Sequence, residues 1–157
     1  MRREDSVVIL RKAVSGLTKV GLRRFLGRAR RAAGLRGAVN VLITTKGELR
    51  LLNRRFRGKD QATDVLSFPA PGHLPLKYAG DLAISADLAA QNGRKLGHSA
   101  VEEVKILILH GVLHLAGYDH ERDNGAMARM EERLRRQLRL PLGLIERNIQ
   151  SARRRKR

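Results

Sequence analysis

Apolar and polar residues follow two periods along the chain, one typical of strands and one typical of helices. Short apolar runs rich in β-branched residues predict strands at residues 6–10, 38–43, 63–68 and 81–84. Between the first two strands, an apolar stripe opposite several arginines predicts a helix over 17–33, which Gly34 ends. Because strands and helices are intermixed, we expect an α+β fold with one mixed sheet of about four strands packed against helices.

Residues that cap helices predict three further helix starts. They are Thr45, Ser85 and Ser99, which we expect to open a helix ending near Gly58, a helix ending near Gly93 and a central apolar helix. Residues 69–80 hold three prolines and two glycines, so we expect a loop there, a mobile flap over a cleft. A last helix with an inward stripe of Met127, Met130, Leu134 and Leu138 should end at Pro141.

The central helix is apolar nearly all round and carries two of three closely spaced histidines. His110 and His114 are four residues apart, so they project from one face of the helix. Gly117 can end the helix in a left-handed conformation, which lets His120 fold back as a third ligand. A lone histidine on such a face is usually a core residue bonded to a backbone carbonyl, but three within eleven residues favour a metal. Three imidazoles with an open fourth position are typical of a catalytic zinc site.

Composition limits the other possibilities. The 157 residues fit a single domain, which we place at residues 1–150, followed by a basic tail at 151–157 that we expect to be disordered. The chain has no cysteine, so nitrogen and oxygen must hold any transition metal. No apolar run has the length of a membrane span or a signal peptide, so we expect a cytoplasmic protein without a membrane partner.

The net charge of +18 indicates a polyanionic partner, of which nucleic acid is the commonest. Aromatic residues make up only 3% of the chain, so recognition should rest on phosphates more than on base stacking.

The histidine spacing matches the metzincin peptidase motif His-Glu-x-x-His-x-x-Gly-x-x-His at every position except one. Gly111 stands where those peptidases need a glutamate as general base, which argues against peptide hydrolysis. A zinc ion held by neutral imidazoles keeps its full charge and can stabilise the transition state of phosphodiester cleavage.

Four sequence blocks follow one another along the chain. They are Leu-Asn-Arg-Arg-Phe-Arg-Gly-Lys-Asp at 52–60, Thr-Asp-Val-Leu-Ser-Phe-Pro at 63–69, Gly-Asp-Leu at 80–82 and the histidine run at 110–120. In the order and spacing of these blocks, from about residue 37 to 130, the chain resembles the YbeY family, bacterial rRNA maturation factors described as metal-dependent, single-strand-specific endoribonucleases. The resemblance implies one Zn²⁺ held by His110, His114 and His120, and a functional arginine at Arg57. We expect Arg57 and His114 to be the catalytic residues. The partners implied are single-stranded RNA, rRNA and the ribosome or its small subunit.

The main hypothesis is therefore a zinc-dependent endoribonuclease acting in rRNA maturation and ribosome quality control, by hydrolysis or transesterification. Two alternatives stay open, a non-catalytic ribosome assembly factor with a structural metal and a zinc metallopeptidase. Another divalent metal could replace zinc, because affinity order alone does not exclude it. The general base is also open among a zinc-bound hydroxide, the substrate 2′-hydroxyl and Asp119.

Overall fold

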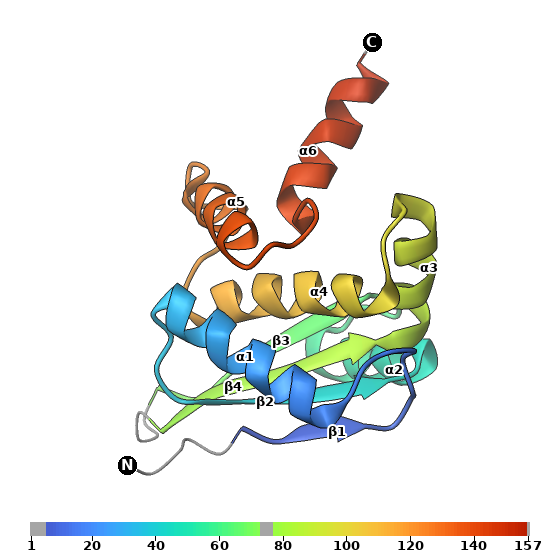
Figure 1. Cartoon of the computed structure of the whole chain (residues 1–157), viewed down its shortest axis with the longest axis vertical. Coiled ribbons are helices and arrows are strands. Elements are labelled where there is room, and N and C mark those ends of the chain that lie inside the picture. The colour runs from blue at the N-terminus through green and yellow to red at the C-terminus, as the bar shows by residue number, and fades with distance from the viewer. Residues whose placement is uncertain (1–5, 73–76, 157) are drawn as a thin grey trace.

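A four-stranded mixed sheet lies at the centre of the computed structural model, which describes residues 6–72 and 77–156 (Figure 1). The strands are β1 (Val8–Leu10), β2 (Ala38–Thr44), β3 (Val65–Pro69) and β4 (Tyr78–Ser85). They lie in the order β1-β2-β4-β3, with β1, β2 and β4 parallel and β3 antiparallel to β4. The expected α+β class with one mixed sheet is confirmed, and β3 is an edge strand.

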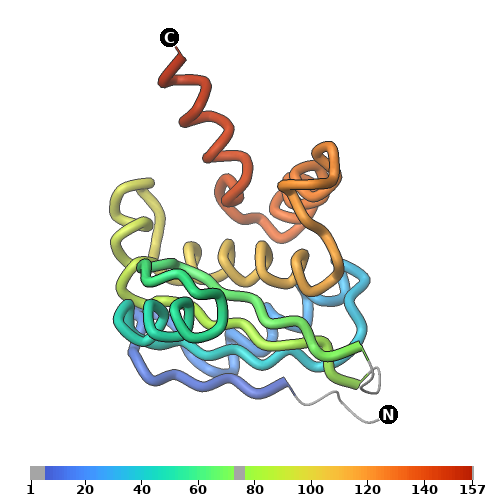
Figure 2. Tube along the Cα trace, turned by 180° about the vertical axis from the view of Figure 1, so that it is seen from behind, coloured from blue at the N-terminus to red at the C-terminus, as the bar shows by residue number. Residues whose placement is uncertain are grey.

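Six helices accompany the sheet within the described residues. They are α1 (Lys19–Ala33), α2 (Lys46–Arg57), α3 (Ala86–Leu96), α4 (Ala100–Leu115), α5 (Ala126–Gln137) and α6 (Leu144–Arg155). Helices α1 and α4 cover one face of the sheet, and α2 covers the other, as the two opposite views show (Figures 1 and 2). Strand residues alternate accordingly, because Leu82 and Ile84 join the main core while Ala83 packs with Leu49 of α2.

The predicted caps at Thr45, Ser85 and Ser99 are all confirmed. Each side-chain oxygen accepts a hydrogen bond from the backbone N–H three residues later, which satisfies a donor that the helix itself leaves free. At Ser99 the cap is a reciprocal capping box, since the Glu102 side chain also accepts a hydrogen bond from the Ser99 backbone N–H at 3.1 Å. The cap at Ser99 fixes where α4 begins, and thereby which turn of that helix carries the histidines.

Helix α4 is buried almost along its whole length, as its apolar sequence predicted. It crosses the sheet so closely at Gly111 that a Cβ atom there would lie 2.6 Å from Cδ2 of Leu82 on β4. Glycine at this position is therefore required by the packing of the helix on the sheet.

The C-terminal part of the chain differs from expectation. Residues 151–155, expected to be disordered, continue helix α6. A buried Ile145 and an ion pair of Arg147 hold the first turn of this helix, and continuing a helix is easier than starting one. Helix α6 was not among the predicted helices, because most of its residues are polar or basic and its apolar stripe is short, limited to Leu144, Ile145, Ile149 and Ala152.

The expected loop at 69–80 is shorter than predicted, since β3 extends to Pro69 and β4 starts at Tyr78. The middle of the expected flap, residues 73–76, lies outside the described residues, as do the first five residues. Among residues 6–72 and 77–156, no helix combines the length and apolar character that crossing a membrane requires.

Candidate metal centre

Three histidines converge at the C-terminal end of α4. His110 and His114 lie one turn apart on the helix, and their ring centroids are 4.7 Å apart. The helix ends as predicted, with Gly117 at φ 100° and the Tyr118 N–H bonded to the Leu113 carbonyl. The chain then folds back, so one ring nitrogen from each of His110, His114 and His120 lies within 4.8 Å of the others. All three predicted metal ligands are thus brought together.

The rings of the two helical histidines are oriented by hydrogen bonds from their outer nitrogens. His110 Nδ1 lies 3.0 Å from Oε2 of Glu131, and His114 Nδ1 lies 3.1 Å from the carbonyl oxygen of Tyr118. When each Nδ1–H donates to its acceptor, both Nε2 atoms carry lone pairs, and these atoms are 3.1 Å apart. Tetrahedral zinc with Zn–N bonds of about 2.0–2.1 Å separates its ligand atoms by roughly 3.3–3.4 Å. The donor set and its orientation therefore fit a zinc ion.

Glu131 was not identified from the sequence. It comes from α5, is 1% exposed, and uses both carboxylate oxygens. While Oε2 faces His110, Oε1 accepts the backbone N–H of Ile145 at 2.8 Å, so the metal centre is joined to the start of α6. A side chain at Gly143 would collide with this carboxylate. The missed signal was an acid on the inward stripe of α5, between Met127 and Leu134.

Burial keeps His114 in the form that binds metal. It lowers the pKa of the His114 imidazole, and the neighbouring His110 lowers that pKa further. The hydrogen bond to the Tyr118 carbonyl acts in the opposite direction without reversing the shift. The neutral imidazole, which is the ligand form, is therefore favoured at neutral pH.

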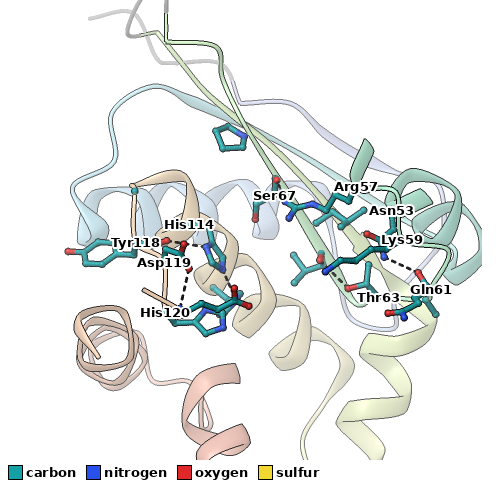
Figure 3. Close-up of a pocket in the computed structure, with 17 residues that line it drawn as sticks. Asn53, Arg57, Lys59, Gln61, Thr63, Ser67, His114, Tyr118, Asp119 and His120 are labelled. Carbon is teal, nitrogen blue, oxygen red and sulfur yellow. Dashed lines mark hydrogen bonds between the residues drawn. The ribbon is translucent and has the colours of Figure 1, made fainter. Parts of the chain in front are cut away.

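The histidines open into a cleft of about 620 Å³ (Figure 3). One wall carries His114, Tyr118, Asp119 and His120, and the opposite wall carries Arg57 and Lys59 from the end of α2 and the residues after it. Arg57, the other predicted catalytic residue, therefore shares the cleft with the three histidines. Its Nη2 donates to the carbonyl oxygen of Ser67 on the edge strand β3 at 2.7 Å, which directs the guanidinium along the cleft wall.

Two other residues raised by the sequence have clear positions. Asp119 lines the cleft, accepts the Glu121 backbone N–H at 3.1 Å, and lies 3.6 Å from Nε of Arg122. Gly111 does not line the cleft and faces Leu82 of the sheet instead. The position where metzincins carry their glutamate is therefore occupied here by a packing contact, and it supplies no general base.

Several known proteins are similar to this chain. The family model described as Endoribonuclease YbeY matches residues 5–139. The Endoribonuclease YbeY of Koribacter versatilis is 57% identical over 146 residues, covering 93% of this chain and 94% of that protein. That of Solibacter usitatus is 49% identical, covering 92% and 95%. The solution structure of TM1509 from Thermotoga maritima is 26% identical, with a TM-score of 0.54 over 81% of this chain and 85% of that one.

Proposed function

Because the chain belongs to the YbeY family of endoribonucleases, we propose that it is a zinc-dependent enzyme that cuts single-stranded RNA. We further propose that its substrate is rRNA at the ribosome or its small subunit, in the cytoplasm, during rRNA maturation and ribosome quality control. The observation that supports zinc dependence is the convergence of His110, His114 and His120 on one cleft, with two of the rings oriented by Glu131 and Tyr118.

The histidines would hold the zinc ion through the three ring nitrogens that face one another. When bound, zinc supplies a Lewis acid whose positive charge stabilises negative charge developing on a phosphodiester. The protein contributes fixed ligand geometry, since His110 and His114 cannot rotate without breaking their bonds to Glu131 and to the Tyr118 carbonyl.

We propose that Arg57 binds the phosphate itself. The bond to the Ser67 carbonyl takes up one N–H of the guanidinium and leaves others for two phosphate oxygens. Lys59, on the same wall, adds a second positive charge. A phosphodiester in the cleft would then lie between these cations and the histidines, and we assign Arg57 and His114 as catalytic residues on this basis.

The proposal is tested by measuring zinc content, RNA affinity and cleavage of a single-stranded oligonucleotide on the same preparations. Wild-type protein should carry about one zinc per chain and lose cleavage with a chelator, and His114→Ala should lose both zinc and cleavage. Arg57→Ala should keep its zinc and lose cleavage by about 10²-fold or more, the scale for one group that stabilises transition-state charge.

Arg54→Ala is the matched control, because Arg54 lies in the same last turn of α2 and does not line the cleft. It should cleave RNA as wild type does. Full activity in a metal-free preparation would contradict the proposal. RNA binding and zinc content without any turnover would instead favour the alternative of a non-catalytic assembly factor.

A further inference from the structure

The C-terminal helix α6 carries a strong positive charge and lies apart from the cleft. We propose that α6 is a second RNA-binding element, which binds phosphates of a long RNA while the cleft binds the strand to be cut. This inference rests on the proposed function for its choice of RNA as the polyanion. Two properties of the helix support it, a rigid base and a free, fully basic end.

The base of α6 is fixed to the protein body by three polar contacts and one apolar contact. Arg147 makes two hydrogen bonds of 2.7 Å to the buried carboxylate of Glu103 on α4. Glu146 accepts two from Arg135 of α5, at 2.7 and 3.1 Å. Ile145 is buried, and its N–H donates to Glu131. A buried, bidentate ion pair of this kind holds the helix in one direction, so α6 is positioned by the core.

The C-terminal end of α6 is basic on every side. Residues 148–157 carry five cations and no acid. Arg153, Arg154, Arg155 and Lys156 are exposed, and none of them pairs with a carboxylate in the part of the chain that the structure describes. Successive helical residues are about 100° apart, so four in a row surround the helix axis. Rotation of the helix about its axis could therefore not turn all four charges toward the protein body, and they remain available to an external polyanion.

The exposed part of α6, residues 148–156, which we call the arm, is also long enough to contact nucleic acid. It points away from the sheet in both views (Figures 1 and 2). Residues 148–156 are exposed, and at 1.5 Å per residue they extend over roughly 14 Å, a length that spans several phosphates of a strand. No residue of α6 lines the cleft, and the family match ends at residue 139, before α6 begins. The charge of α6 is therefore separate from the site that cuts RNA.

The test compares two triple variants that each remove three positive charges. The arm variant replaces Arg153, Arg154 and Arg155 with glutamine, which keeps a good helix former at each position. The control variant replaces Arg11, Lys12 and Arg50, which are exposed and already paired with Glu48, Asp87 and Asp60 respectively. Binding is measured with chelator present, so that no RNA is cut, against salt concentration for a structured RNA of about 100 nucleotides and for an oligonucleotide of about eight.

The arm variant should bind the long RNA more weakly, with the slope of log K against log salt smaller by about 2 to 3, since each phosphate contact contributes about 0.7 to 0.9. Its affinity for the oligonucleotide, and its cleavage of that oligonucleotide with zinc restored, should match wild type. The control variant should change the long-RNA slope by less than about one. Equal effects of the two triple variants on long RNA, or an equal loss by the arm variant on both RNAs, would overturn the proposal. Binding is read without turnover, so a failure of the proposed nuclease activity would appear separately, as absent cleavage by wild type.

Discussion

Glu131 joins the metal centre to α6, and replacing it with glutamine gives the sharpest test of how the centre is built. The carboxylate accepts from two donors, His110 Nδ1 at 3.0 Å and the Ile145 N–H at 2.8 Å. Glutamine has the same shape but only one acceptor oxygen, so its NH₂ group must face one of those donors. At 1% exposure, water cannot relieve this conflict.

The cost to zinc affinity follows from the same geometry. Loss of the carboxylate removes the group that fixes the tautomer and the ring orientation of His110, and such outer partners typically contribute 10- to 100-fold in metal affinity. Glu131→Gln should therefore bind zinc about 10- to 100-fold more weakly, which is roughly 1.4 to 2.7 kcal/mol. The measurement is a zinc competition titration against a fluorescent chelator at neutral pH.

The control is the neighbouring Glu132→Gln, which removes an equal charge from an exposed side chain paired with Arg136 at 2.7 Å. It should leave zinc affinity unchanged. Urea unfolding with chelator present measures the separate loss of folding stability in Glu131→Gln, expected at about 1 to 3 kcal/mol for a buried donor without an acceptor. Wild-type zinc affinity in Glu131→Gln, or an equal loss in Glu132→Gln, would refute this account of the centre.

Two further outcomes are expected. Gly111→Ala should destabilise the protein by about 1 to 3 kcal/mol in urea unfolding, because the new Cβ would lie 2.6 Å from Leu82 Cδ2. The control is Gly47→Ala in α2, where a Cβ would meet no atom within 4 Å, and it should be neutral or stabilising. Equal effects of the two substitutions would contradict the packing argument. Burial raises the pKa of Glu103, but hydrogen bonds from Arg147 and His98 outweigh this effect and hold the pKa of the folded protein below the usual 4.5. The ionised carboxylate therefore stabilises the fold fully above pH 4.5, and this stabilisation is lost as the pH falls through the lowered pKa of the folded state. Acid unfolding of Glu103→Gln should be less steep than that of wild type, and an unchanged pH profile would count against the ion pair.

Local signals in the sequence were enough to predict most elements and the cluster of three histidines. Capping residues such as Ser99 act within one turn, and the spacing of His110 and His114 is fixed by the helix itself, so both can be read without tertiary information. The order of the strands could not be read in this way, because pairing of β2 with β4 joins residues about 40 positions apart. The same limit explains why α6 and Glu131 were missed, since contacts with Glu103 and His110 across the fold stabilise them.

The bond from Arg57 to the Ser67 carbonyl has a consequence for how the protein behaves at high concentration. Strand β3 is an edge of the sheet, and an outward carbonyl on an edge can pair with a strand from another molecule. Arg57 occupies this carbonyl and places a positive charge over it, which opposes the approach of a second copy. Removing the arginine thus leaves the Ser67 carbonyl free to pair with a strand of another molecule, and it also removes a cation from the cleft. Activity of Arg57→Ala should therefore be measured on protein shown to be monodisperse.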